Sequence, residues 1–461
     1  MTCKRLGGLL LAAMLLLSGC RVRTPDVRGN GGSLPKTSHS QTLPGNTADG
    51  DVSSSSENPA GSQSEAFIVP TLPALPTLPS FPENPASEPE LPPIVTDPPA
   101  VPDPTLPAEE EPEPSVVGLT PLQPEEYYGR QTLEKAGNRR LLDAYQRITA
   151  GCAALQEEIS LADLKLTPEE TETVFRYVQD DHPLYCWVDS QYTYYTLSNR
   201  VTKIVPRYTM SLAEAKGAEA GIAASAAYML EGLHDGMDEF QRELIIHDRL
   251  IRWASYDSSL SAPHTHDLYG VLMNRLAVCD GYAKAFQYLL SQAGIQALMA
   301  QGWADGGGHA WNVVRINGAY YHTDITWDDP LGMGDPFYVS YGYFNITARE
   351  MEQDHLIDSD SYPLPPCTAT ADNYFLRLGY TADSLDADQF AAAVAKQIQD
   401  GGTGWYAIRY TGGYLLESVL SEFLDWNAAA IRDGAALRSG SFLPPLSQYA
   451  LNGSIVELYF G

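Results

Sequence analysis

Two stretches decide the fold of this chain: residues 276–294, LAVCDGYAKAFQYLLSQAG, and residues 309–330, HAWNVVRINGAYYHTDITWDDP. In the first stretch, apolar residues recur at helical spacing after Cys279, and Gly294 is a natural residue to follow a helix C-terminus. The sequence therefore predicts a helix of ~14 residues with Cys279 in its first turn. The N-terminus of a helix carries a partial positive charge and free N–H donors. Both favour a thiolate, and the donors can also receive an oxyanion.

The second stretch predicts a β-hairpin. Its centre, Asn317-Gly318, is the preferred two-residue type I′ turn and has alternating strands on both sides. Pairing outward from this turn sets Trp311 opposite Asp324, and His309 shares the face of Trp311. His309 and Asp324 are then diagonal neighbours with Cα atoms ~7–8 Å apart, close enough for the carboxylate to hydrogen-bond the imidazole. A one-residue slip of the register would put the two side chains on opposite faces.

Two other histidines compete for the role of base to Cys279. We interpret the register as placing His322 on the strand face opposite to Asp324. His266 precedes the cysteine helix and has no predictable geometry. The favoured base is therefore His309, which Asp324 would hold in the correct tautomer while the ring accepts the thiol proton.

The set of motifs resembles the transglutaminase-like superfamily. The resemblance lies in LYGVLMNRLAVCDGYAKAFQYLL, HAWNVV and YYHTDITWDDP, with HDRLIRWASYD upstream and YFNIT downstream, and covers about 240–355. It implies a papain-like core, in which a Cys at a helix N-terminus packs on an antiparallel sheet that bears His and Asp. The implied fold class is therefore α+β. By resemblance, Cys279 is the nucleophile, His309 the general base and acid, and Asp324 the orienting carboxylate.

The chain departs from the family pattern in a few places. Relatives often carry Gly where Arg275 stands, so we expect this bulky side chain to reshape the acyl-donor cleft. The second oxyanion donor of such enzymes is an upstream side chain, for which Tyr269 is a candidate. Asp328 and Asp329 are interpreted as a turn that ends the strand, because no calcium-loop spacing is present. No metal and no cofactor are expected.

Other histidines and cysteines are assigned structural roles. His182 is expected to cap or pack at a helix end. His247 and Asp248 lie on a helix predicted near 238–254, where a hydrogen-bonded structural pair is the favoured interpretation. Three further cysteines lack CxxC spacing and are interpreted as small buried hydrophobes, with one disulfide among them left open. They are Cys152, Cys186 and Cys367.

The N-terminus resembles the signal peptide of bacterial lipoproteins. Residues 1–20, MTCKRLGGLLLAAMLLLSGC, contain a positive segment, a short apolar segment and small residues just before Cys20. This resemblance implies cleavage before Cys20, attachment of diacylglycerol to its thiol, and a location at the outer face of a bacterial membrane. The next hundred residues are rich in Pro, Ser and Glu and predict an extended tether that packs against nothing.

Composition supports this division. All 27 Tyr and all 7 Trp lie at or after Tyr127, so the core must form after the tether. The formal net charge is -29, and no Lys or Arg lies between Ser38 and Gly129. This acidic excess argues against nucleic acid as a partner, since phosphate binding needs clustered Lys and Arg.

The predicted organisation has five segments and one chemical centre. They are a signal peptide (1–20), a tether (21–120), a helical region (121–210), a catalytic domain (211–365) and a small α/β domain (366–461). The sequence predicts a cell-surface thiol enzyme that acts on amides of proteins or peptides, by acyl transfer or by hydrolysis. The alternative is a non-catalytic binding or scaffolding module on the same fold.

Overall fold

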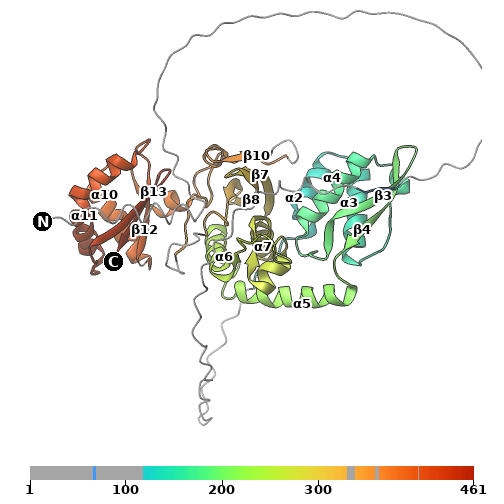
Figure 1. Cartoon of the computed structure of the whole chain (residues 1–461), viewed down its shortest axis with the longest axis horizontal. Coiled ribbons are helices and arrows are strands. Elements are labelled where there is room, and N and C mark those ends of the chain that lie inside the picture. The colour runs from blue at the N-terminus through green and yellow to red at the C-terminus, as the bar shows by residue number, and fades with distance from the viewer. Residues whose placement is uncertain (1–65, 69–117, 330–337, 359–362, 403) are drawn as a thin grey trace, which may run out of the picture.

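The computed structural model describes residues 66–68, 118–329, 338–358, 363–402 and 404–461. Three units follow one another along the long axis of the molecule (Figure 1), and their helices and mostly antiparallel sheets confirm the α+β class. The predicted signal peptide with Cys20, and most of the tether, lie outside the described residues. Among the described residues, no helix has the length and apolar character needed to cross a bilayer.

The N-terminal unit packs three helices against a four-stranded sheet. The helices are α2 (Tyr128–Lys135), α3 (Arg139–Ala153) and α4 (Pro168–Asp181). In sheet order, the strands are β1 (Ala66–Ile68), β3 (Val188–Leu197), β4 (Arg200–Tyr208) and β2 (Ile159–Ser160). A capping box of Thr167 and Glu170 starts α4. His182 ends this helix, as expected, and its ring is stacked on Tyr185.

One segment of the predicted tether is part of this sheet. Strand β1 pairs antiparallel with β3 and sets Ala66 opposite Tyr195. Without β1, this edge of β3 would expose unpaired backbone N–H and C=O groups. The expectation that the tether packs against nothing is therefore wrong for this short segment.

The central unit holds the predicted cysteine helix and hairpin. Its long helices are α5 (Leu212–Met229), α6 (Glu239–Trp253) and α7 (Cys279–Gln292). Its main sheet has the order β10 (His355–Ile357), β7 (Ala297–Ala304), β8 (Gly307–Ile316) and β9 (Ala319–Thr323), all antiparallel. The smaller elements are a parallel pair, β5 (Ser255–Tyr256) with β6 (Leu276–Ala277), and the short helix α8 (Ala348–Met351).

The main sheet is covered on both faces. Val314 and Ile316 of β8 belong to the hydrophobic core that also contains the buried residues of α6 and α7. Trp311 and Val313, which point the other way, share a core with the helices of the N-terminal unit. The segments on either side of residue 210 are thus held together by one continuous core.

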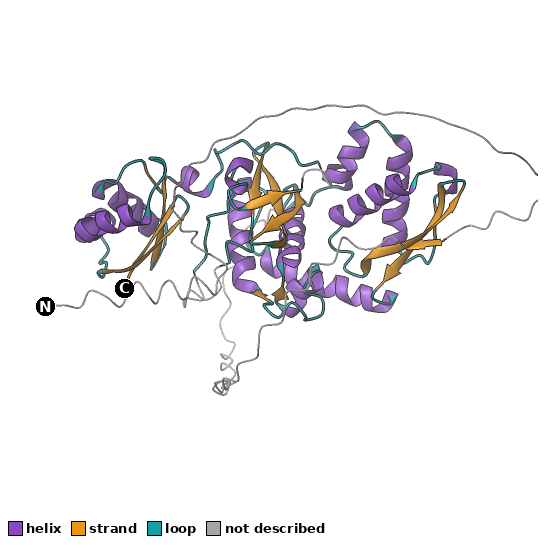
Figure 2. Cartoon of the chain, turned by 45° about the horizontal axis from the view of Figure 1, so that its top comes forward, coloured by secondary structure: helices purple, strands orange, loops and turns teal. Residues whose placement is uncertain are grey.

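The C-terminal unit is a four-stranded sheet with two long helices beside it (Figure 2). The sheet order is β11 (Thr381–Ala382), β12 (Trp405–Tyr410), β14 (Ile455–Phe460) and β13 (Leu446–Asn452). The helices are α10 (Ala387–Gln399) and α11 (Glu417–Ser439), and the short α9 (Tyr374–Leu378) precedes them. Buried Ile431 and Ala435 continue the apolar stripe of helix α11 through its second half, and the helix ends just before Gly440.

A buried carboxyl group joins α6 to the sheet. Glu243 is fully buried, accepts a hydrogen bond from Asn345 Nδ2 at 2.6 Å and contacts the Thr323 hydroxyl at 3.5 Å. Burial raises the pKa of Glu243 to about 8, although the hydrogen bond from Asn345 and the nearby His247 oppose this shift. Burial therefore favours the protonated form of this carboxyl in the folded protein.

We expect Glu243→Gln to flatten the dependence of stability on pH. The raised pKa stabilises the wild type fully below pH ~4.3, and this contribution is lost as the pH rises towards about 8. Gln stays neutral, so the variant should melt on the order of 5 °C above the wild type at alkaline pH and close to it in acid. Thermal melts from acid to alkaline pH measure this difference. Exposed Glu134→Gln serves as the control, and a Glu243→Gln curve parallel to the wild type would contradict the assignment.

Candidate active site

Cys279 is the first residue of α7, as predicted, and Val278 before it is the extended N-cap residue. Val278 N donates to Thr265 O at 3.0 Å, which ties the start of the helix to the preceding loop. This loop lies so close that a Cβ at Gly281 would collide with Thr265 O. The Cys279 side chain is half-buried, so its thiol lies at the free N–H groups of the helix yet stays within reach of a substrate.

The hairpin has the predicted register. Ile316 is opposite Ala319 and Val314 is opposite Tyr321. Both turn residues, Asn317 at φ 51° and Gly318 at φ 85°, are in the left-handed region that a type I′ turn requires. This register carries His309, on β8, and Asp324, just after β9, to the same end of the sheet.

The structure brings His309 and Asp324 into direct contact. His309 Nε2 lies 2.6 Å from Asp324 Oδ2, and the carboxylate is fully buried. Its other oxygen, Oδ1, accepts hydrogen bonds from Thr326 N at 3.0 Å and Trp327 N at 3.2 Å. Two backbone donors thus fix the plane of the carboxylate that orients the imidazole.

The electrostatics of the pair favour a charged imidazole. Burial lowers the pKa of His309, but the negative charge of Asp324 and hydrogen bonds to Asp324 and Cys279 outweigh it and raise the pKa to about 10. Burial also acts to raise the pKa of Asp324, yet its two histidine neighbours hold it well below the ordinary value. Because Nε2 of His309 is engaged by Asp324, Nδ1 is the nitrogen left for the Cys279 thiol.

The prediction that His322 and Asp324 lie on opposite faces of the strand was wrong. Residues two apart in a strand lie on the same face, so His322 and Asp324 share a side of the sheet. His322 pairs with Val313, and its Nδ1 accepts the indole N–H of Trp311 at 2.9 Å. Burial lowers the pKa of His322 to about 4, so this ring is neutral and serves as a hydrogen-bond partner in the core.

His266, the other competing histidine, is exposed and forms an ion pair with Asp280, at 2.8 Å between Nδ1 and Oδ1. His266 therefore lies near the start of α7, but the carboxylate that it contacts is Asp280 and not Asp324. Tyr269, the candidate oxyanion donor, packs with its ring 5.0 Å from that of His264. Tyr256 was not singled out from the sequence.

Tyr256 lies beside the approach to Cys279. It pairs with Ala277 across the two short parallel strands β5 and β6, two residues before Cys279. The pKa of Tyr256 is raised to about 12, first by burial and then by the negative charges of Cys279 and its neighbours. Tyr256 is therefore, beside Tyr269, a second tyrosine near Cys279 to consider as an oxyanion donor.

Arg275 stands at a position with left-handed backbone, at φ 58° and ψ 33°. Gly adopts this conformation without strain, whereas a residue with a side chain adopts it only rarely. The guanidinium lies over the Trp253 ring, with 3.9 Å between Cζ and the ring centroid. The side chain is thus committed to this stacking contact.

His247 and Asp248 pack beside the site and help to hold its backbone in place. His247 is fully buried, with Nδ1 3.2 Å from Asp248 Oδ1 and Nε2 3.2 Å from Asp328 Oδ2. Asp329 accepts a hydrogen bond from the Tyr282 hydroxyl at 2.7 Å. These contacts hold the turn after Asp324 against α6 and α7, in agreement with the structural interpretation of these residues.

Sequence reasoning missed His355. This histidine is buried on β10, and its Nε2 lies 3.1 Å from Asp324 Oδ2, the same oxygen that His309 engages. No sequence signal pointed to it, because it stands alone in a polar stretch and reaches the site only when β10 pairs with β7.

Potential metal ligands occur in one group among the described residues. They are nitrogens of His309 and His355 and an oxygen of Asp324, within 4.8 Å of one another. We interpret this group as a hydrogen-bonded network, because both Nε2 atoms lie at hydrogen-bond distance from Asp324 Oδ2.

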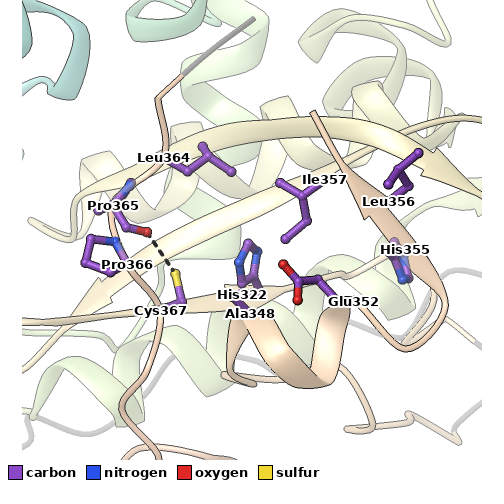
Figure 3. A pocket seen from close by; sticks show the side chains of 10 residues that line it. All are labelled: His322, Ala348, Glu352, His355, Leu356, Ile357, Leu364, Pro365, Pro366 and Cys367. Carbon is purple, nitrogen blue, oxygen red and sulfur yellow. Dashed lines mark hydrogen bonds between the residues drawn. The ribbon is translucent and has the colours of Figure 1, made fainter. Parts of the chain in front are cut away.

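A cavity of about 390 Å³ lies behind His355 (Figure 3). His322, Glu352 and Ile357 gather at its centre, and Cys367 lines its other end. Cys279 is not among its lining residues, so this cavity is not where the acyl group would sit. All four described cysteines are free, so the structure shows no disulfide among Cys152, Cys186 and Cys367.

Comparison with known proteins identifies a family for the central part of the chain. Residues 229–325 match the family described as the transglutaminase-like superfamily, and the match includes all three residues of the Cys–His–Asp group. Kyphoscoliosis peptidases from Homo sapiens and Mus musculus are each 28% identical over 114 residues, which cover 21% of this chain. The chain thus spans 17% of the length of these curated relatives. The family match confirms the resemblance predicted from the sequence.

Two solved structures share this similarity. A crystal structure of a TGase is 13% identical, with a TM-score of 0.24, and the match covers 30% of this chain and 43% of that one. A protein from Cytophaga hutchinsonii, described as a candidate cysteine protease, is 14% identical with a TM-score of 0.21. That match covers 29% of this chain and 56% of the other.

Proposed function

With residues 229–325 forming a transglutaminase-like domain, we propose that the protein is a thiol enzyme that cleaves amide bonds through a thioester on Cys279. The observation that carries this proposal is the contact of His309 with both Asp324 and Cys279, at the N-terminus of α7. A sulfur nucleophile, a base within reach and a carboxylate that orients the base are the parts that acyl transfer requires.

The first half of the reaction forms the acyl-enzyme. His309 holds the proton of the Cys279 thiol as an imidazolium, and the Cys279 thiolate Sγ bonds to the amide carbon as the carbonyl oxygen becomes an oxyanion. The N–H groups at the start of α7 stabilise that charge, with Tyr256 or Tyr269 as the second donor. His309 then gives its proton to the amide nitrogen, the C–N bond breaks, the amine leaves and a thioester remains.

The second half decides the product. If a primary amine attacks the thioester carbon, His309 accepts a proton from that amine, the C–S bond breaks, and Cys279 leaves as the thiolate, which completes an acyl transfer. If water attacks, the same proton movements complete a hydrolysis, and the enzyme acts as a peptidase, amidase or deamidase. The three side chains serve both routes equally, so the access of water and amine to the thioester selects between them.

We place the enzyme at the outer face of a bacterial membrane, anchored through a diacylglycerol on Cys20. The support is the sequence of residues 1–20 and the Pro-rich tether that follows. Proteins or peptides of the cell envelope are then the substrates within reach. The second candidate is a binding or scaffolding module that keeps the fold without turnover.

The reaction type is tested by mass spectrometry of a Gln-containing protein incubated with the enzyme and a primary amine. We expect one of three changes in that substrate: addition of the amine, a gain of about 1 Da by deamidation, or a cut in the backbone. Each change identifies one route from the thioester. A mass increase on Cys279 itself would reveal the acyl-enzyme intermediate. A folded enzyme that leaves every Gln and peptide bond unchanged across a broad substrate panel would favour the binding module.

A further inference from the structure

His355 occupies a position between two carboxylates at the active site. Its Nε2 lies 3.1 Å from Asp324 Oδ2, and its Nδ1 lies 2.6 Å from Asp354 Oδ1. Asp354 in turn accepts the Tyr343 hydroxyl at 2.6 Å. Asp324 is therefore held from one side by His309 and from the other by a hydrogen-bonded chain that ends at the surface, where the Asp354 side chain is 41% exposed.

Three aromatic rings pack around the His355 ring. Its ring centroid lies 4.4 Å from that of Trp327, 5.2 Å from that of Trp311 and 5.5 Å from that of Tyr343. Trp327 also donates its backbone N–H to Asp324 Oδ1. The same few residues thus fix both the histidine and the carboxylate that it contacts.

We propose that His355 is a positioning residue, which holds Asp324 in the orientation that His309 needs. Its positive charge also reduces the electrostatic stabilisation that Asp324 gives to the protonated form of His309. This inference rests on the proposed function. The centroids of the two imidazole rings are 5.3 Å apart, and both rings contact one carboxylate oxygen. One negative charge shared by two cations holds each proton less firmly than it would hold one alone.

The charge of His355 follows from its surroundings. Burial lowers the pKa of His355, but its hydrogen bonds to Asp324 and Asp354 outweigh burial and raise it. The ionisable groups that face the ring are Asp324 and Asp354, His309 and His322, Tyr343, and Glu352 across the cavity. The carboxylates in contact with the ring favour the imidazolium.

This arrangement has a catalytic consequence. His309 must accept a proton from the thiol and then release it to the departing amine. If Asp324 were free to neutralise His309 alone, the imidazolium would be a weaker acid and expulsion of the amine would slow. His355 thereby tunes the acid step without touching the substrate.

The test compares His355→Gln and Asp354→Asn with His322→Gln in the full chain. Histidine labelled with ¹³C at Cε1 lets NMR follow the ionisation of His309 with no substrate present. We expect its midpoint to rise by roughly one pH unit in His355→Gln, by less in Asp354→Asn, and to stay in place in His322→Gln. Asp354→Asn leaves the buried ring intact, so it still tests the inference if His355→Gln fails to fold.

Activity gives a second readout. We expect kcat to fall roughly 10-fold in His355→Gln, with the alkaline limb of the pH profile moved upward and KM little changed. An unchanged or lowered His309 midpoint in both variants overturns the inference. If the His309 midpoints shift between wild type and variants as expected but the wild type turns over no amide, the proposed function is wrong and the inference about His355 stands.

Discussion

Replacing Cys279 with Ala should abolish product formation, with a loss of at least ~10³-fold. The acyl-enzyme needs a sulfur that bonds to the carbonyl carbon, and no neighbouring side chain supplies one. Among the described residues, the other cysteines are buried away from the start of α7. The measurement is the rate of the mass change in a Gln-containing substrate, with wild type and variant at equal concentration.

Cys152→Ala is the matched control, because Cys152 is buried in the N-terminal unit and contacts none of the proposed catalytic groups. It should cost some stability and leave the rate per folded molecule unchanged. Iodoacetamide should alkylate Cys279 first in the wild type, since burial raises the pKa of Cys152, Cys186 and Cys367 to about 12. Full activity in Cys279→Ala, or equal labelling of all four thiols, would contradict the assignment.

Replacing Asp324 with Ala should damage catalysis and stability together. The carboxylate is fully buried and accepts two backbone N–H groups and contacts two imidazoles, so its removal leaves four polar partners without an acceptor. Breaking such a buried pair costs ~3–5 kcal/mol of unfolding free energy, and the rate should fall ~10²–10⁴-fold as His309 loses its orientation. Thermal melts and single-substrate kinetics measure the two effects separately.

Asp181→Ala separates stability from chemistry. Asp181 is also buried and accepts two backbone N–H groups, from Gly129 and Arg130, and the Tyr145 hydroxyl, but it lies in the N-terminal unit. This variant should melt earlier than the wild type yet keep its rate per folded molecule. If Asp324→Ala lowered the melting temperature as Asp181→Ala does and kept a normal rate, Asp324 would be a structural residue only.

The sequence by itself determined the parts of this protein that local rules control. Helix α7 begins at Cys279 because apolar spacing and a following Gly specify a helix within one segment. The register of the hairpin follows from Asn317-Gly318, since a type I′ turn fixes which residues face one another. Together these two local features place a thiol, an imidazole and a carboxylate in elements that a transglutaminase-like core brings together.

The tertiary structure alone decided the surroundings of Asp324. His355 reaches this carboxylate only because β10 adds to the edge of β7, a contact between segments with no shared periodicity or turn. The packing of Trp311 against the N-terminal helices and the pairing of β1 with β3 are of the same kind. Local propensity determines secondary structure and hairpin register, whereas long-range burial and backbone pairing determine which elements become neighbours, because those energies depend on residues far apart in the chain.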